Sequence, residues 1–260
     1  MPETNATMRR VYMMARRIKG ILFDLGDTLL DFGEVDIRSL FEAGARLAYD
    51  YLATIGQPLP SFARYHRRQL WSVRWNYFKS RFTRREFNAL NIIDTIGKGM
   101  GQTLTREQVL ELAWLWYQPL SNVAGTEPGL RERLVEFHQA GLTLGLVSNT
   151  FVPGEALDRH LRRENLLDLL PVRVYSCDVR YRKPDPRIFQ LALDRSGLTA
   201  GETLFVGDSI PADIAGTNRM GMITVLKDPA DKFAADPVQP THRIAKLADL
   251  PAIVNQYNGG

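Results

Sequence analysis

Short apolar runs that alternate with helical segments constrain the fold of this chain more than any other feature of its sequence. A buried strand, Ile18–Asp24, comes first, since its apolar β-branched residues end in a tight turn. After Gly125 we expect, in order, helix Leu130–Ala140, strand Leu142–Ser148, helix Pro153–Glu164, strand Val172–Ser176, helix Pro186–Ser196, strand Thr203–Gly207, helix Pro211–Met220, strand Ile223–Leu226, a short strand near Ile244 and a C-terminal helix. Repeated units of this kind predict an α/β fold, with a parallel sheet covered by helices on both faces.

A helical segment interrupts this alternation directly after the first strand. No convincing strand occurs from about Val35 to Tyr117, and the expected helices are Ile37–Ile55, Phe62–Phe82, Arg84–Ile96 and Thr105–Gln118. Thr105 and Gln108 have the spacing of a capping box at the start of the last helix. We therefore predict a parallel α/β core with an inserted helical module.

The composition is that of an ordinary soluble globular protein. No stretch of the 260 residues approaches the ~20 apolar residues that span a bilayer. The single cysteine, Cys177, excludes an internal disulfide and suits a reducing cytoplasm, where we expect it to be a buried packing thiol. The basic N-terminal residues have too short an apolar patch for a signal peptide, so we expect residues 1–17 to be a disordered leader, or translation to start near Met14.

A basic and aromatic segment lies inside the helical module. Between Asp50 and Glu86 there is no acidic residue, whereas basic residues are frequent: Arg64, Arg67, Arg68, Arg74, Lys79, Arg81, Arg84 and Arg85. Aromatic residues alternate with them: Tyr65, Trp71, Trp75, Tyr77, Phe78 and Phe82. Such a surface could attract nucleic acid or a phosphorylated small molecule. We favour the simpler interpretation, an amphipathic helix with its aromatic residues in the core and its arginines in solvent.

Polar residues follow four of the expected strands. They are Asp24, the pair Ser148–Asn149, Lys183 in the loop after the third strand, and the pair Asp208–Ser209. Ligands of a parallel sheet bind beyond the carboxyl ends of its strands. A carboxylate nucleophile, a hydroxyl, a fixed cation and a second carboxylate suit phosphoryl transfer assisted by a hard divalent cation.

These residues also carry a family resemblance. The chain resembles the haloacid dehalogenase-like (HAD) hydrolase superfamily through four segments in the right order: Phe23–Thr28, Val147–Asn149, Arg182–Pro186, and Val206–Ser209 continuing to Asp213–Gly216. The resemblance implies a Rossmann-like core formed by residues 18–32 and 124–260. It also implies a helical cap, residues 33–123, that closes over the site and selects the substrate.

The resemblance assigns a role to each polar residue. Asp24 would be the nucleophile that becomes an aspartyl-phosphate. Mg²⁺ would be bound by Asp24, the Gly26 carbonyl and Asp208, with Asp213 near the metal. Ser148, Asn149 and Lys183 would hold the phosphoryl oxygens, and Thr28 would support the loop after Asp24. Taken singly, Asp213 could instead be an ordinary acid in the first turn of a helix, Lys183 a surface lysine, and Thr28 or Ser148 turn residues.

Gly26 departs from the family pattern. Most phosphatases of the family have a second aspartate there, which protonates the leaving group; here the next residue, Asp27, is the acid. Neighbouring side chains of an extended backbone point in opposite directions, so Asp27 is not a simple replacement. Glycine keeps the backbone carbonyl for the metal but loses acid–base catalysis, typically worth ~10²–10⁴-fold in rate. We therefore expect a preference for leaving groups that need no proton, such as acyl and aryl phosphates.

Our leading hypothesis is a cytoplasmic Mg²⁺-dependent phosphatase that acts on a small phosphorylated metabolite. Gly26 favours one alternative, a binding or regulatory protein with weak or no catalysis. A second alternative, a haloacid dehalogenase, needs no metal and fits the carboxylates Asp208 and Asp213 poorly. We expect neither a membrane nor a nucleic acid as partner. The sequence does not identify the phosphorylated substrate or the oligomeric state.

Overall fold

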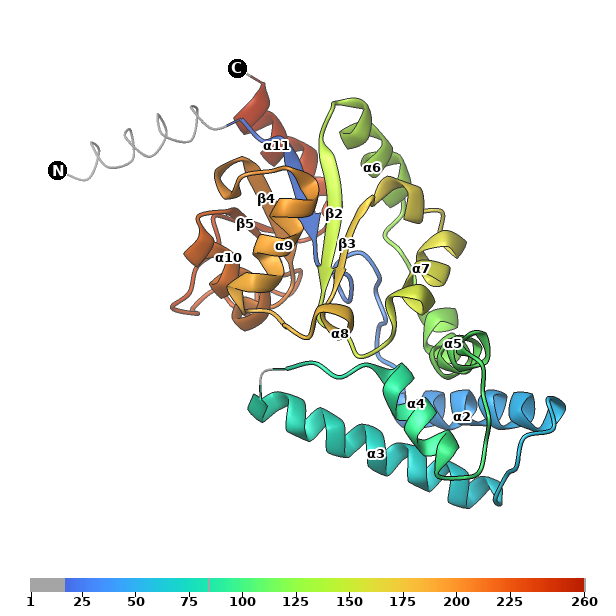
Figure 1. The fold of residues 1–260 in the computed structure, drawn as a ribbon. Coiled ribbons are helices and arrows are strands. Elements are labelled where there is room, and N and C mark those ends of the chain that lie inside the picture. The colour runs from blue at the N-terminus through green and yellow to red at the C-terminus, as the bar shows by residue number, and fades with distance from the viewer. Residues whose placement is uncertain (1–16, 84, 260) are drawn as a thin grey trace.

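A six-stranded, entirely parallel sheet forms the centre of the molecule. The computed structural model describes residues 17–83 and 85–259 (Figure 1). The strand order is β3-β2-β1-β4-β5-β6. The strands are β1 (Gly20–Phe23), β2 (Thr143–Ser148), β3 (Val172–Tyr175), β4 (Thr203–Gly207), β5 (Ile223–Lys227) and β6 (His242–Ile244). The α/β fold and the expected strands are confirmed. The predicted leader lies outside the described residues, except for its last residue.

Helices cover both faces of the sheet because successive side chains of each strand point to opposite sides. On one face, Ile21 and Phe23 of β1 join a core with α6 (Leu130–Gln139), α7 (Gly154–Arg163) and α11 (Leu250–Asn258). On the other face, Leu22 packs with α9 (Pro186–Ser196). The short helices α8 (Ser176–Val179) and α10 (Ala215–Met220) complete the core.

Four further helices form the helical insertion that the sequence predicts. They are α2 (Ile37–Thr54), α3 (Phe62–Thr83), α4 (Ala89–Lys98) and α5 (Arg106–Val123). They share a hydrophobic cluster of their own, centred on buried residues such as Leu52, Tyr65 and Leu112. Figure 1 shows them together beyond the lower end of the sheet. No helix within the described residues combines the length and apolar character needed to cross a membrane.

The structure corrects the ends of two predicted helices of the insertion. The third helix of the insertion starts at Ala89 rather than Arg84, because the Asn88 side chain accepts a hydrogen bond from the Leu90 backbone N–H at 2.9 Å and caps the helix. The last helix begins with the predicted capping box of Thr105 and Gln108. It continues through Pro119 to Val123, beyond the predicted end at Gln118.

The helix predicted at Pro211–Met220 consists of two parts. Its first turn, Ile210–Ile214, is a π-helix, and only the remainder is α-helical. The backbone N–H groups of Asp213 and Ile214 both donate to the Ser209 carbonyl, at 2.8 and 3.3 Å. This wider turn begins two residues after the predicted site residue Asp208, with Ser209 as its cap, and π-turns are frequent at functional sites.

The interpretation of the basic and aromatic segment was wrong for most of its aromatic residues. Tyr65 is buried, and the arginines whose side chains are described are largely exposed, as expected. However, Trp71, Trp75, Phe78 and Phe82 of α3 are exposed instead of being in the core. Helical spacing cannot show which face a neighbouring helix covers. Cys177 is buried, as predicted.

Candidate active site

Strand β1 delivers Asp24 to the carboxyl end of the sheet. The Asp24 backbone N–H donates to the Val206 carbonyl of β4 at 2.8 Å, so the residue continues the β1–β4 ladder. The chain then turns sharply: the Asp27 N–H donates to the Leu30 carbonyl at 2.6 Å, and Asp27 has a left-handed backbone with φ of 55°. Asp24 therefore faces the edge of the sheet where parallel strands commonly bind ligands.

Lys183 joins two carboxylates at this edge. Its ammonium forms an ion pair with Asp24 and lies 2.7 Å from Oδ1 of Asp213. Asn149 holds the backbone of Lys183 from both sides, since its Oδ1 accepts from the Lys183 N–H at 2.7 Å and its Nδ2 donates to the Lys183 carbonyl at 3.0 Å. The lysine, predicted to lie in a loop, is thus fixed by two neighbouring strand ends and is almost fully buried.

Asp24, Asp208 and Asp213 form a carboxylate cluster. Each offers an oxygen within 4.8 Å of the others. Asp213 is oriented by the Ser209 N–H, which donates to its Oδ2 at 3.1 Å. Gly207 makes this approach possible, because a Cβ there would lie 2.5 Å from Cγ of Asp213. Oxygen ligands of this kind fit a hard divalent cation such as Mg²⁺.

The charges of the cluster are unbalanced without a cation. Burial raises the pKa of Asp208 to about 6, and the neighbouring Asp213 adds to the shift. Burial likewise raises the pKa of Asp213 to about 6, although Lys183 opposes it. Asp24 has a pKa above its ordinary value for the same reason. Burial alone would lower the pKa of Lys183, but Asp213 and Asp24 outweigh it and raise that pKa. One ammonium thus faces three carboxylates, and a divalent cation would balance their charge.

Thr28 and Ser148 are buried at the same edge. The Thr28 hydroxyl has no hydrogen-bond partner in the described part of the chain, although it is shielded from solvent. A buried hydroxyl without a partner is costly, so the Thr28 hydroxyl is available to form a hydrogen bond with an oxygen of a ligand. Ser148 is the last residue of β2, directly before Asn149.

Position 26 is open, and Asp27 beside it is exposed to solvent. A Cβ on Gly26 would meet only Cε2 of Phe32 at 3.5 Å, which is an ordinary contact. Asp27 is exposed, and its charge helps to raise the pKa of Asp208. Asp27 therefore acts on the charge of the carboxylate cluster from an exposed position.

A buried ion pair that the sequence analysis missed supports the loop after Asp24. Lys227, at the end of β5, donates from Nζ to the Thr28 carbonyl at 3.0 Å and lies 3.0 Å from Oε1 of Glu127. Oε2 of Glu127 accepts from the Leu247 N–H at 2.8 Å. The sequence contained a signal for this ion pair, namely a lysine at the end of an apolar strand. Buried lysines are usually paired with an acidic residue, so Lys227 could have been expected to have such a partner.

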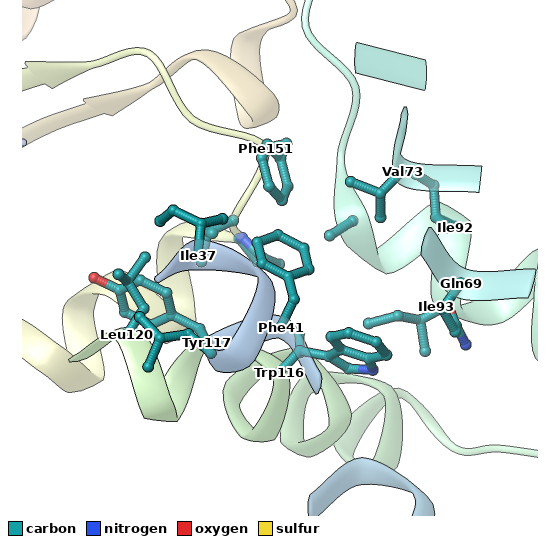
Figure 2. Close-up of a pocket in the computed structure, with 15 residues that line it drawn as sticks. Ile37, Phe41, Gln69, Val73, Ile92, Ile93, Trp116, Tyr117, Leu120 and Phe151 are labelled. Atoms are coloured by element: carbon teal, nitrogen blue, oxygen red, sulfur yellow. The ribbon is translucent and has the colours of Figure 1, made fainter. Parts of the chain in front are cut away.

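An apolar cavity of about 90 Å³ lies between the insertion and the loop after Asn149 (Figure 2). Figure 2 shows Phe151 facing Phe41 across it, with Trp116 and Ile37 nearby. Of the residues that line it, none is a predicted site residue. Phe151 nevertheless follows Asn149 by two positions, so the cavity adjoins the loop that fixes Lys183.

Comparison with known proteins agrees with this geometry. The model of the haloacid dehalogenase-like hydrolase family matches residues 18–221. The chain belongs to this family. A HAD phosphatase of Thermococcus onnurineus has the same fold, with a TM-score of 0.59 and 22% identity over 93% of this chain and 100% of that chain. A 2-haloacid dehalogenase of Pseudomonas syringae has a TM-score of 0.63 with 24% identity over 92% of this chain and 99% of that chain. These HAD structures confirm the Rossmann-like core with a helical cap.

Curated relatives include several phosphatases. The chain is 31% identical to the ribulose-1,5-bisphosphate 5-phosphatase of Halopiger xanaduensis, over 49% of this chain and 56% of the relative. It is 24% identical to the pyrophosphatase PpaX of Bacillus velezensis, over 92% of this chain and 97% of the relative. The chain spans about half the length of the first curated relatives that it matches.

Proposed function

We propose that the protein is a Mg²⁺-dependent phosphatase that hydrolyses a small phosphorylated metabolite through an aspartyl-phosphate on Asp24. The observation that carries this proposal is the buried Asp24–Lys183–Asp213 arrangement beside Asp208. It unites a nucleophile, a fixed cation and a carboxylate site for a metal. The phosphatases among the curated relatives support the same reaction class.

The reaction follows from the positions of these groups. A carboxylate oxygen of Asp24 attacks the phosphorus, and the bond from phosphorus to the leaving oxygen breaks. Water then hydrolyses the aspartyl-phosphate, releasing inorganic phosphate and restoring Asp24. Lys183, Ser148 and Thr28 would hold the phosphoryl oxygens. Asn149, predicted for the same task, has both ends of its side chain bonded to the Lys183 backbone and would instead fix Lys183 in place. Mg²⁺, bound by Asp24, Asp208, Asp213 and the Gly26 carbonyl, would supply positive charge that offsets the negative charge of the phosphoryl group.

The leaving group must take its proton from water, because Gly26 supplies no acid. Alkyl alkoxides are poor leaving groups without protonation, whereas carboxylates and phenolates leave readily. We therefore propose acyl or aryl phosphates as the preferred substrates. The apolar cavity beside the loop after Asn149 suits the body of such a substrate better than that of a sugar phosphate, since most of its lining is apolar and only Gln69, Trp116 and Tyr117 have polar side-chain groups.

Hydrolysis of p-nitrophenyl phosphate with and without Mg²⁺ tests the proposal. Its leaving group hardly needs a proton, so the assay reports on the nucleophile and the metal alone. We expect Mg²⁺-dependent turnover that Asp24→Asn abolishes. Asp27→Asn is the matched control, because Asp27 lies three residues after Asp24 in the same loop and its side chain is exposed. This variant should retain turnover of p-nitrophenyl phosphate.

One outcome would favour a second function. If folded protein binds Mg²⁺ but shows no turnover, the proposed activity is wrong. Gly26 would then mark a binding or regulatory protein that keeps the family's metal site without its catalysis.

A further inference from the structure

Helix α3 has an exposed aromatic stripe, which we define as Trp71, Trp75, Phe78 and Phe82. Their side chains are between 46% and 75% exposed. The spacings of four, three and four residues place them in one line along the helix. Four aromatic side chains of this exposure present roughly 400–500 Å² of apolar surface, the size of the largest patch on a typical monomer, and such patches are often functional.

The stripe lies on the face of α3 opposite its packed face. Tyr65, Gln69 and Ser80 are buried. Tyr65 packs in the hydrophobic cluster of the insertion, and the Ser80 hydroxyl accepts a hydrogen bond from Arg182 of the core at 3.1 Å. Positions 71, 75, 78 and 82 lie about half a turn away from these three buried residues at 100° per residue. Figure 1 shows α3 along the outer edge of the insertion, on the side away from the sheet. The stripe is thus separate from the candidate active site.

Cations border the stripe, and one of them, Lys79, lies over the ring of Trp75 at 5.1 Å from its centroid. Arg64, Arg67, Arg74 and Lys79 are exposed, and none of them forms an ion pair within residues 17–83 and 85–259. Helix α3 itself has no acidic residue. The groove beside it contains Glu42 of α2, but Arg38 of α2 offsets that charge. The face therefore combines apolar rings with a net positive border, which complements an anionic partner.

Three rings of the stripe stack in sequence, and the fourth, Phe82, is tilted by 58° against Phe78. The ring centroids of Trp71 and Trp75 are 6.0 Å apart with an interplanar angle of 10°, and those of Trp75 and Phe78 are 6.1 Å apart at 17°. Their faces are turned toward each other along the helix. Single-stranded nucleic acids bind by stacking bases on free aromatic faces, so this arrangement favours a partner that contacts the ring edges.

We propose that α3 rests on an anionic lipid surface, with the aromatic stripe at the level of the acyl boundary and the bordering cations among the head groups. Aromatic rings and basic side chains on one straight helix are the features of helices that lie in a membrane interface. The 22 residues of α3 extend over roughly 33 Å, enough for a flat contact. A second copy fits less well, because two such faces would oppose like charges.

This partner differs from the sequence expectation of no membrane. That expectation rested on the absence of a spanning segment, and a helix that lies on the surface needs none. Anionic lipids are typical of the cytoplasmic leaflet, which suits the expected cytoplasmic location.

Co-sedimentation of the full chain with vesicles tests this proposal without reference to phosphatase activity. Vesicles of phosphatidylcholine alone are compared with vesicles that contain one third phosphatidylserine. We expect binding to the anionic vesicles, with a blue shift of the emission of Trp71 and Trp75. Trp71→Ser/Phe82→Ser should weaken binding at least tenfold. Arg67→Gln/Arg74→Gln/Lys79→Gln should weaken it roughly 100-fold, since each cation near an anionic leaflet contributes about fivefold.

Matched controls separate the stripe from general effects. Leu47→Ser/Val123→Ser removes exposed apolar side chains elsewhere, and Arg131→Gln/Arg219→Gln removes exposed charges elsewhere; both should bind as the parent does. Equal binding to both vesicle types, or no binding, would overturn the proposal. So would a dimer in light scattering that Trp71→Ser/Phe82→Ser dissociates, or binding to single-stranded RNA but not to lipid.

Discussion

Gly26 stands two residues after the proposed nucleophile, and a Cβ at this position would meet only Cε2 of Phe32. Its φ is not in the left-handed region, unlike that of Asp27. The backbone therefore accepts a side chain at position 26 without strain. The loop after Asp24 would therefore accept an aspartate at position 26 without a change in its backbone.

Restoring that aspartate gives the first prediction. Gly26→Asp should raise kcat/KM for an alkyl phosphate such as glycerol phosphate by ~10²-fold or more, since general acid catalysis is worth ~10²–10⁴-fold. Turnover of p-nitrophenyl phosphate should change little. Gly26→Asn is the matched control, because it fills the same space without an acidic proton to transfer. If Gly26→Asp gives no gain, another acid already serves, and Asp27 is the first candidate.

At the scale of elements, the site depends on close contact between β4 and the π-helical turn that follows it. Gly207 ends β4, and its lack of a side chain lets the Asp213 carboxylate lie against its backbone. The wide turn at Ile210–Ile214 brings Asp213 back over the strand end. The third carboxylate is thus positioned by a glycine and a turn, neither of which has a reacting group.

Gly207→Ala should disturb that contact. The added Cβ would lie 2.5 Å from Cγ of Asp213, and overpacking of this kind costs about 1–3 kcal/mol. We expect a lower melting temperature together with weaker Mg²⁺ binding, measured by calorimetry. Gly125→Ala is the control, because a Cβ there has no neighbour within 4 Å and φ is not left-handed. Unchanged Mg²⁺ affinity in Gly207→Ala would contradict the positioning role.

The ion pair of Lys227 and Glu127 links the end of β5 to the loop after Asp24. Lys227→Met leaves Glu127 without this partner and the Thr28 carbonyl without its donor. Breaking a fully buried pair costs about 3–5 kcal/mol, but Glu127 is 18% exposed and also lies 4.0 Å from Arg133. Denaturant unfolding should therefore show a loss of about 2–3 kcal/mol, which Lys227→Met/Glu127→Leu partly restores. Lys19→Met, which removes the exposed pair with Glu202, should cost less than about 1 kcal/mol. Equal losses in the two single variants would refute this role.

For the whole molecule, stability depends on the balance between protons and a cation at the carboxylate cluster. Burial raises the pKa values of Asp208 and Asp213 to about 6, from 3.8 in the unfolded chain. Without metal, the folded state thus binds more protons than the unfolded state at pH values between 3.8 and about 6. The contribution of both groups to stability is therefore greatest below the unfolded pKa and is lost as pH rises toward 6.

Mg²⁺ should reverse this dependence, because it binds the ionised carboxylates. We expect Mg²⁺ at about 100 times its Kd to raise the melting temperature by roughly 5–10 °C at pH 8. At pH 5 the increase should nearly vanish, since protons compete with the metal. Differential scanning fluorimetry at both pH values measures this. Asp208→Asn should remove the Mg²⁺ effect, whereas Asp231→Asn, at an exposed position, should keep it. A Mg²⁺ effect that is equal at both pH values would argue against this site.

The sequence determined the order of strands and helices, the parallel sheet and the family. These follow from local patterns: apolar runs of strand length, capping residues, and polar residues directly after strands. Parallel strands share one edge for their carboxyl ends, so the grouping of Asp24, Asn149, Lys183 and Asp208 could be predicted without coordinates. The capping residue Asn88 and the π-turn after Ser209 moved the ends of elements, because a single side-chain or backbone hydrogen bond decides them.

Only the tertiary structure decided which groups share partners across the sheet. Lys183 pairs with both Asp24 and Asp213, and Lys227 reaches Glu127 and the Thr28 carbonyl, from segments far apart in the sequence. The tertiary structure also decided the exposure of the aromatic stripe. A helix repeats its side chains every 3.6 residues whatever surrounds it, so the sequence shows that these rings share a face, and only the packing of the neighbouring helices leaves that face in solvent.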